Sequence, residues 1–527
     1  MNAFNLHRQK PLLKELSPKI WSMAILFILT CRISDGQLAR RADDAYEVGN
    51  YIDAVNYYEE LVEKMPDDQE FNLRLGMSYL KTFKDPLFAL DYLLRAENLG
   101  KVDEEVYLAI AKASTFHLDY DQASVYLNKF IEEGGVNRKN KLLIEKLKTD
   151  YQAARDLLKY PVDVDFVNAG DKINSKHPDY HPFITKNGGT LFFTSRRKSK
   201  PGDKPEFDGY FPSDIFVSRL TPDGWTESER LPQPINTPYD EQIVGITNSG
   251  DSIFFYIDHV NEFGDIYISA RQVGMYADPQ ALEVVNSQAI ESACSTSEDR
   301  NTILFSSSRD GGFGELDIYM IKKLPTGEWG EPMNLGPEIN TPFSEDFPTL
   351  SGDGETMYFC SNGHPGMGGY DLFFSTWDSQ NNVWTKPQNV GYPINTPFDD
   401  KTISFTAEGN MAYITAIRPE GKGDLDIFEV RFNRKETEDP AIFLINIPKA
   451  AEVNGGAPEI IVKNEFDETI GKYLPNKITG RYVMALYPGK YFLYVDAKEF
   501  QPYTEVLVVN NYHTRQDQNV KIIKLEK

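Results

Sequence analysis

The chain has 527 residues, of which 41% are apolar and 25% are charged, and its formal net charge at pH 7 is −24. A chain of this length and apolar content can bury several cores, so about three domains are expected. An acidic body repels phosphate backbones, which argues against nucleic acid as a partner, and otherwise the charge serves solubility.

Residues 1–36 are predicted to be a signal peptide. A basic region precedes an apolar run from Trp21 to Cys31, which is too short to span a bilayer but suits the core of an export signal. Two cleavage sites compete. Residues 34–36 place small side chains where signal peptidase reads them, whereas Cys31 ends a stretch that loosely resembles a lipoprotein cleavage site. Both alternatives predict a periplasmic protein, and lipidation at Cys31 would hold it at the outer membrane.

Residues 37–158 are predicted to be helical, because apolar residues recur at spacings of three and four. The same internal spacing of 12, 4 and 3 residues occurs twice, with a looser copy between. The two sets are Ala42, Ala54, Tyr58, Leu61 and Ala111, Ala123, Leu127, Phe130. This pattern resembles the tetratricopeptide repeat in three copies, followed by a charged amphipathic helix from Lys139 to Leu158.

Stacked helix pairs of this kind expose a concave surface to protein partners. Aromatic and arginine side chains commonly dominate such contacts, so we expect them on the inner helices. The candidate partner-binding residues are Tyr46, Arg74, Tyr79, Tyr107 and Lys112. The alternative is that these helices only brace the domain that follows.

Residues 159–434 are organised around one phrase, an aspartate followed by Ile or Leu and then Phe or Tyr. The phrase begins at Asp214, Asp265, Asp317, Asp371 and Asp426, with steps of 51, 52, 54 and 55 residues. A fixed period of this size indicates a repeat architecture. Each unit holds about four short apolar strands between turn residues, which predicts one antiparallel sheet per unit. Sheets repeated around an axis form a β-propeller, with five blades predicted and six as the alternative.

Other features return within the units. An Ile-Asn-Thr-Pro turn stands at 235–238, 339–342 and 394–397, but it is missing from Met275 to Cys294, where a reshaped outer edge is expected. Because the aspartate occurs once per unit, we interpret it as a structural latch whose carboxylate accepts bonds from turn N–H groups. The alternating segment 161–167 is predicted to complete the last sheet, since an open ring would leave an unpaired edge.

These units resemble the WD-like repeats of TolB-type propellers, above all those in periplasmic proteins of Bacteroidota. A polar linker, residues 435–440, follows them. Residues 441–527 then alternate apolar and polar positions, and the stretch from Thr479 to Tyr503 resembles the carboxypeptidase-regulatory-like domain. That resemblance implies a small seven-stranded β-sandwich, which in its relatives is non-catalytic and serves as a spacer or docking module.

Motifs for chemistry are mostly missing from the sequence. It contains neither His-Glu-x-x-His nor Gly-x-Ser-x-Gly, and His177 with His181 has no third ligand nearby. Residues 311–319 resemble a calcium-binding nonapeptide but lack its tandem copies. Cys294 and Cys360 are expected to be buried free thiols, with a bridge between them as the alternative. We therefore expect no catalytic residue, no metal and no cofactor.

The order of the three modules resembles that of OmpA-family periplasmic proteins of Bacteroidota, including the PorE-like component of the type IX secretion and gliding machinery. Those relatives continue into a peptidoglycan-binding domain where this sequence stops, so direct peptidoglycan binding is not expected. The resemblance implies a non-enzymatic scaffold that binds envelope proteins and meets the membrane only through a partner or a lipid anchor. The alternative is a carbohydrate-binding or hydrolytic propeller that uses its central mouth; convergent carboxylates or a histidine–metal set there would favour it.

Overall fold

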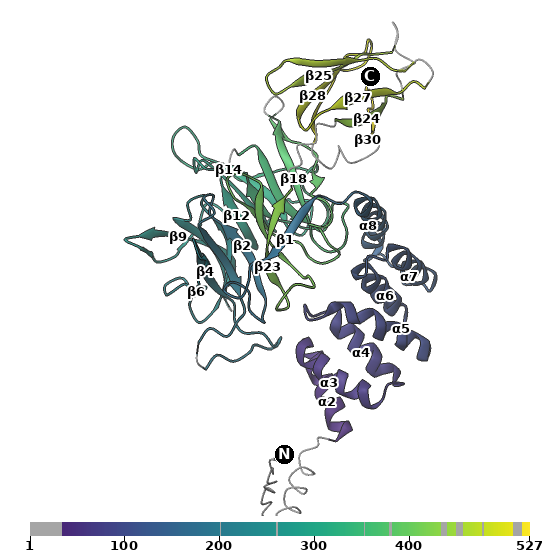
Figure 1. Cartoon of the computed structure of the whole chain (residues 1–527), viewed down its shortest axis with the longest axis vertical. Coiled ribbons are helices and arrows are strands. Elements are labelled where there is room, and N and C mark those ends of the chain that lie inside the picture. The colour runs from purple at the N-terminus through teal and green to yellow at the C-terminus, as the bar shows by residue number, and fades with distance from the viewer. Residues whose placement is uncertain are drawn as a thin grey trace, which may run out of the picture.

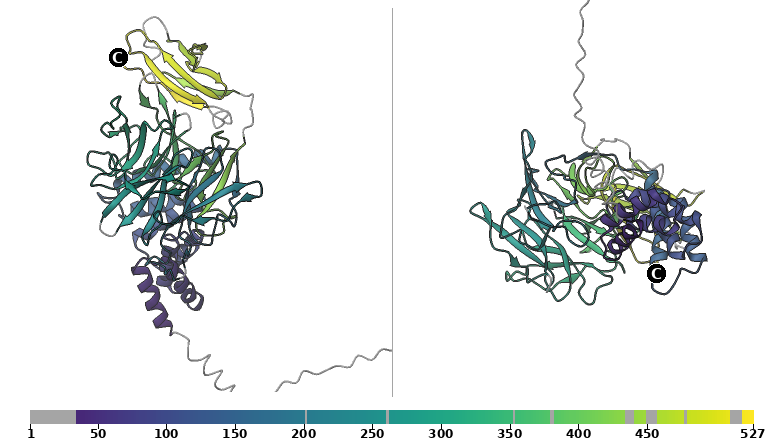
Figure 2. Two further views of the ribbon diagram at one scale, coloured as in Figure 1. Left: turned by 90° about the vertical axis from the view of Figure 1, so that its left-hand side faces the viewer. Right: turned by 90° about the horizontal axis from the view of Figure 1, so that it is seen from below.

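The computed structural model describes residues 34–200, 202–259, 262–351, 354–378, 382–433, 440–448, 457–476, 479–509 and 519–527. In chain order these residues form a helical domain, a large β domain and a small β-sandwich (Figure 1). The sandwich and the first helices lie at opposite ends of the β domain (Figure 2). The helices of these residues include none that is long and apolar enough to cross a membrane. Cys31 lies outside the described residues.

The helical domain consists of three helix pairs and a final long helix. Their bounds are α2 (Asp35–Glu47), α3 (Tyr51–Lys64), α4 (Gln69–Tyr79), η1 (Pro86–Phe88), α5 (Ala89–Leu99), α6 (Glu104–Phe116), α7 (Tyr120–Glu132) and α8 (Lys141–Lys159). Within each pair the helices pack along one another, and each pair packs on the next, with α8 on α7. The small residues of the predicted repeat, such as Ala54 and Ala123, are fully buried at these contacts.

Local sequence sets the ends of these helices. Ser34, Asn50, Asp68 and Asp119 each accept a main-chain N–H with the side chain that precedes a helix. Such caps satisfy donors that have no partner within the first turn. Cleavage after residue 36 would remove the Ser34 cap and shorten α2.

The β domain contains five antiparallel sheets of four or five strands. The first holds β2 (Asp179–Ile184), β3 (Thr190–Ser195), β4 (Asp214–Thr221), β5 (Gly224–Trp225) and β6 (Glu229–Arg230); the second holds β7 (Asp240–Ile246), β8 (Ser252–His259), β9 (Glu262–Gln272), β10 (Met275–Tyr276) and β11 (Gln280–Ala281). The third holds β12 (Glu291–Thr296), β13 (Thr302–Ser307), β14 (Asp317–Lys322) and β15 (Met333–Asn334); the fourth holds β16 (Glu345–Leu350), β17 (Thr356–Ser361), β18 (Asp371–Asp378), β19 (Val383–Trp384) and β20 (Gln388–Asn389). The fifth holds β1 (Val164–Asn168), β21 (Ile403–Phe405), β22 (Met411–Ala416) and β23 (Asp426–Phe432).

The first strands of successive sheets pack against one another, which gives a propeller-like arrangement. Strand β2 contacts β7, β7 contacts β12, β12 contacts β16, and β2 also contacts β21 and β22 of the fifth sheet. The fourth and fifth sheets are joined by the N–H of Asp400, which donates to the carbonyl of Tyr370 at 2.7 Å. The ring closes because β1 pairs antiparallel with β23, with Val164 opposite Phe432. This pairing confirms the closing strand predicted at 161–167.

The C-terminal domain is a sandwich of seven described strands. They are β24 (Ala441–Asn446), β25 (Ile460–Asn464), β26 (Thr469–Tyr473), β27 (Tyr482–Leu486), β28 (Gly489–Val495), β29 (Tyr503–Val509) and β30 (Asn519–Ile522). One sheet has the order β27-β24-β30 and the other β26-β25-β28-β29. Alternate residues of both sheets, such as Phe443 and Leu493, meet in one core. The alternating apolar residues of this part of the chain thus form its core.

Cys294 and Cys360 lie in the core of the β domain, on β12 and β17. Both are free and buried, so the alternative of a bridge between them is wrong. Burial disfavours the charged thiolate and raises the pKa of both thiols. These two cysteines therefore act as small apolar core residues.

Candidate functional site

The repeated aspartates lie where the third strand of a sheet begins, and most of them bind the preceding loop. At Asp317, Asp371 and Asp426 the carboxylate accepts main-chain N–H groups from residues three and four positions upstream. Asp214 instead accepts from the Ser199 hydroxyl and the Arg230 guanidinium, each at 2.5 Å. Asp265 lies within β9, opposite Ile257. The side-chain contacts of Asp214, Asp317, Asp371 and Asp426 are thus contacts within their own sheets.

A second repeated residue, which sequence reasoning missed, ties the segment that follows each sheet back to the third strand of that sheet. One asparagine per sheet bonds both the N–H and the C=O of the residue after the repeated aspartate, at 2.7–3.0 Å. These asparagines are Asn174, Asn236, Asn286, Asn340 and Asn395. Three of them belong to the Ile-Asn-Thr-Pro turns. The repeated turn was therefore visible in the sequence, but no role had been assigned to its asparagine.

Asn286 corrects the expectation for residues 275–294. This segment lacks the Ile-Asn-Thr-Pro turn, but Asn286 makes both bonds to Ile266. Strands β10 and β11 also pair with β9 as β5 and β6 pair with β4. The prediction of a reshaped outer edge in this sheet is therefore wrong. Asn174, at the start of the domain, bonds Ile427 in the last sheet and so helps to close the ring.

Each sheet also buries one carboxylate close to the start of its first strand. These residues are Asp179, Glu241, Glu291, Glu345 and Asp400, all at most 2% exposed. Each accepts a bond from a Ser or Thr four residues upstream. Burial raises the pKa of Glu241 and Glu345 to about 7 because the charged form loses its hydration. The spacing Ser/Thr-x-x-x-Asp/Glu was the sequence signal for this set.

The position directly after each buried carboxylate differs in every sheet. In chain order it is Tyr180, Gln242, Ser292, Asp346 and Lys401. The first strands converge here, and the Ser292 hydroxyl donates to the Asp346 carboxylate of the next sheet at 2.6 Å. We call these five residues the mouth positions. A position that varies while its neighbours repeat is free of the demands of the fold and is available for function.

Three of the five mouth positions line a cavity of about 820 Å³ between the helical domain and the β domain. The helical side is formed by the segment between α4 and η1 and by α6 and α8, and the β side by loops at the start of the first strands. Tyr180, Gln242 and Lys401 are among the residues that line it. Pockets of 300–1,000 Å³ with mainly apolar walls and a few polar groups are typical ligand sites. The cavity is therefore the candidate functional site.

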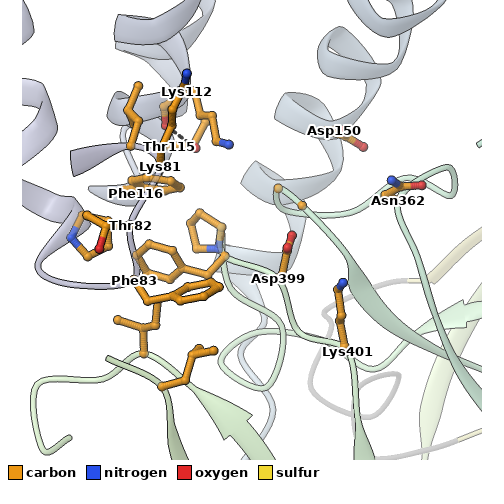
Figure 3. Close-up of a pocket in the computed structure, with 18 of the residues that line it drawn as sticks. Lys81, Thr82, Phe83, Lys112, Thr115, Phe116, Asp150, Asn362, Asp399 and Lys401 are labelled. Carbon is orange, nitrogen blue, oxygen red and sulfur yellow. Dashed lines mark hydrogen bonds between the residues drawn. The ribbon is translucent and has the colours of Figure 1, made fainter. Parts of the chain in front are cut away.

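Aromatic side chains from both domains form one wall of the cavity. The rings of Phe116 on α6 and Phe398 in the β domain lie 4.5 Å apart between centroids. Phe83, which follows α4, lies beside them and keeps 42% of its surface exposed (Figure 3). An apolar surface of this kind gains free energy when a ligand covers it.

Charged and polar side chains from the β domain form the opposite wall. Figure 3 shows Lys401, Asp399 and Asn362 on that side, and Lys112 near the aromatic rings. The Lys401 ammonium lies 4.5 Å from the centre of the Tyr370 ring. Within the described part of the chain, neither Lys401 nor Lys112 has a carboxylate within 4.0 Å of its ammonium.

Buried polar contacts hold the two walls together. Asp150 on α8 pairs with Lys146 at 2.5 Å and also accepts the N–H of Gly366 from the fourth sheet at 3.1 Å. The Tyr120 hydroxyl donates to the carbonyl of Met367 at 2.7 Å. Burial raises the pKa of Asp150, and the Lys146 ammonium opposes that shift. The cavity thus has a fixed shape, because its floor is bonded to both domains.

The five predicted partner-binding residues lie in different surroundings. Lys112 lines the cavity. Arg74 lies over the Tyr46 ring at 4.6 Å, outside the cavity lining, and Tyr107 packs near Tyr126. Tyr79 is only 2% exposed, stacks on Tyr92 and bonds Glu59, so its assignment to the groove is wrong. Phe83 and Lys401 carried no repeat signal, because they lie in segments that differ between units.

The histidines do not assemble into a metal site in the described residues, which contain no group of three His, Cys, Asp or Glu side chains able to hold an ion. His181 lines the cavity, and its Nδ1 is buried without a hydrogen-bond partner. Burial lowers the pKa of His181 to about 3, so the ring is neutral. His177 packs edge-on against Phe211, away from that cavity.

No family model and no curated protein matches the chain. Among solved structures, it is similar to a putative TolB from Agrobacterium tumefaciens, with 13% identity over 51% of this chain and 90% of that one and a TM-score of 0.31. It is also similar to TolB from Acinetobacter baumannii, with 12% identity over 60% of this chain and 62% of that one and a TM-score of 0.30. An alpha-L-arabinofuranosidase from Podospora anserina has 13% identity over 51% of this chain and 97% of that one, with a TM-score of 0.31. Likeness at this level supports no conclusion about function, and the architecture described above rests on the chain's own topology.

Proposed function

We propose that the protein is a non-enzymatic periplasmic scaffold of the cell envelope that acts by binding other proteins. In this proposal the helix pairs are three tetratricopeptide repeats, the five sheets are the blades of a propeller, and the sandwich is a carboxypeptidase-regulatory-like domain. The three helix pairs support the first assignment, and the five asparagine ties support the second. The repeated aspartates are latches of the blades, not catalytic groups.

The observation that carries the proposal is the cavity shared by the helical domain and the mouth positions. Helical repeat stacks and propellers both present concave surfaces to partners. Here the two surfaces face each other across about 820 Å³, and buried bonds fix their spacing. Aromatic rings at the centre of a concave surface are the usual source of binding free energy. A protein segment that enters this cavity would contact both domains.

The specific version of the proposal is a component of, or accessory to, the type IX secretion or gliding machinery. It rests on the order of the modules and on the resemblance to PorE-like proteins. Export by the segment 1–36, with cleavage after residue 36 or lipidation at Cys31, would place the chain in the periplasm or at the outer membrane. N-terminal sequencing of the mature protein separates these two forms, and an intact Met1 would end the export proposal.

The test uses the full chain with a photo-reactive phenylalanine analogue in place of Phe83 inside the cavity. The matched control carries the analogue at Phe466, which is 75% exposed in the sandwich. After irradiation of envelope fractions, we expect a discrete protein adduct from Phe83 that Phe466 does not give, identified by mass spectrometry. Equal adducts from both positions, no adduct at Phe83, or release of sugars from envelope polysaccharide by the purified protein would overturn the proposal.

A further inference from the structure

We infer that the cavity recognises an extended polypeptide segment in which a large apolar side chain is followed closely by a carboxylate. This inference rests on the proposed function and deepens it by naming the chemistry of the segment. Three features of the cavity carry it: the aromatic wall, the ammonium groups of Lys401 and Lys112, and the mixed donors and acceptors between them.

The aromatic wall requires a large apolar group. Phe83 and Leu143 remain 42% and 39% exposed although they come from different parts of the helical domain and face the same cavity. Phe116 and Phe398 close the wall behind them. Covering such surface is worth about 25 cal/mol per Å² of apolar area, so a Phe, Leu or Trp side chain of the segment would fill this side.

The lysines require a negative charge on the opposite side. The other cations of the lining already have partners. Lys146 pairs with Asp150, Arg196 pairs with Glu206 and Asp208, and the Lys81 ammonium donates to the Tyr51 hydroxyl at 3.0 Å. Lys401 and Lys112 have no such partner in the described residues, although the chain as a whole is strongly acidic. Lys401 is half-buried beside the neutral His181, and a partly desolvated ammonium favours an anionic partner. A ligand carboxylate would therefore bind at Lys401, with Lys112 strengthening the attraction from the helical side.

The groups between these two sides suit a peptide main chain. Gln242 carries both a donor and an acceptor, and Asp399 an exposed carboxylate. Asn362 and Thr415 add an amide and a hydroxyl whose oxygens also accept the N–H groups of Ser344 and His181. An extended segment offers alternating N–H and C=O groups. Such a set of side chains can accept hydrogen bonds from the N–H groups and donate them to the C=O groups. A free phosphate would leave the aromatic wall unused, and an acyl chain would leave these polar groups without partners.

The test measures fluorescence polarisation of the full-length mature chain with labelled hexapeptides. The probe is Gly-Ser-Phe-Asp-Gly-Ser, and its two analogues replace Phe by Ala or Asp by Asn. We expect the probe to bind at least tenfold more tightly than either analogue. Lys401→Met should weaken the Asp probe about tenfold and leave the Asn analogue unchanged, whereas Lys172→Met, on an exposed propeller lysine outside the cavity, should change neither.

Phe83→Ser should likewise weaken the Phe probe and spare the Ala analogue, with Phe466→Ser as the control. Equal binding of probe and analogues, or an unchanged Asp preference in Lys401→Met, overturns the inference even if Phe83 crosslinks an envelope protein. Binding of phosphatidylglycerol vesicles that Lys401→Met abolishes, without peptide binding, overturns it in favour of a lipid. Selective peptide binding without any crosslink at Phe83 in envelopes supports the recognition chemistry and contradicts the scaffold function.

Discussion

The helical domain and the sandwich flank the same β domain, but they are joined to it in different ways. Two hydrogen bonds and one ring contact hold the helical domain. Asp150 accepts the Gly366 N–H, the Tyr120 hydroxyl donates to the Met367 carbonyl, and the Phe116 ring packs against Phe398. The sandwich reaches the β domain through Lys490, which lies 3.4 Å from the Trp377 carbonyl and 3.6 Å from the exposed Glu355 carboxylate. Buried bonds couple the positions of two domains, whereas a solvated ion pair adds little.

This difference indicates that the helical domain and the β domain together form one functional unit. The cavity lies at the firmly bonded junction, so its two walls keep a constant spacing. None of the described sandwich residues lines the cavity, and the ion pair that connects the sandwich joins the Lys490 side chain, 20% exposed, to the exposed Glu355 carboxylate. We therefore assign recognition to the helical and β domains together and a spacer or docking role to the sandwich.

The strongest way to break the comparison is Asp150→Ala. The change leaves the Lys146 ammonium buried without a partner and removes the acceptor of the Gly366 N–H, so we expect a loss of about 3–5 kcal/mol. Urea unfolding followed by helical circular dichroism and by tryptophan fluorescence should show separate transitions in this variant. Asp156→Ala, on the exposed face of α8, is the control. Coincident transitions with less than about 1 kcal/mol lost would contradict a rigid junction.

A smaller loss is expected when the change lies inside the β domain. Asp317→Ala removes the acceptor of two turn N–H groups and of the Asn334 amide, which should cost about 1–3 kcal/mol. Tryptophan fluorescence during urea unfolding measures it, and Asp310→Ala in the same loop serves as the control. A fully stable Asp317→Ala variant that has lost a specific enzymatic activity would refute the structural role.

The buried carboxylates predict an unusual pH dependence for the β domain. The pKa of Glu241 and of Glu345 is about 7 in the folded chain, against about 4.3 for Glu in an unfolded chain. Between these values the folded state binds more protons, so its stability falls as pH rises from about 4 to 7. Each group contributes up to about 1 kcal/mol per pH unit. The urea midpoint of unfolding should depend less steeply on pH in Glu345→Gln than in the unmodified chain, and Glu328→Gln should leave this dependence unchanged. The same dependence on pH in both variants would argue against the raised pKa.

The smallest effect is expected at the sandwich junction. Lys490→Ala removes a partly exposed ion pair and should change the free energy of unfolding by no more than about 0.5 kcal/mol. It should also leave peptide binding in the cavity unchanged. Differential scanning calorimetry of the full chain measures the first effect. A loss above about 1.5 kcal/mol would show that the sandwich is coupled to the β domain as firmly as the helices are.

Sequence reasoning succeeded where the chain repeats itself. The repeated aspartates located a strand in every sheet, and the apolar spacing located all three helix pairs, because each unit solves the same packing problem. The same reasoning failed at Tyr79, since helical spacing shows which residues share a face but not whether that face meets a neighbouring helix or solvent.

The cavity was beyond prediction because its residues do not repeat. Phe83 follows a helix, and Phe398 lies in a loop more than 300 positions later, so only the packing of two domains brings them together. Lys401 lies at a position that holds a different residue in each sheet, so period analysis passes over it. The carboxylates four residues after Ser or Thr repeat in every sheet and could have been found.

The closing pair of strands has a mechanical consequence. The chain enters the propeller at Val164 and leaves it at Phe432, and these two residues lie opposite each other on β1 and β23. A tension applied at residues 163 and 433 therefore acts on adjacent ends of one antiparallel pair, whereas the buried bonds of Asp150 and Tyr120 would carry a tension on the helical domain into the fourth sheet. The Asn433 N–H, bonded to the Asp163 carbonyl, would be the first bond to open, followed by the ladder one rung at a time. The remaining four sheets, and most of the cavity wall, lie outside this line of force.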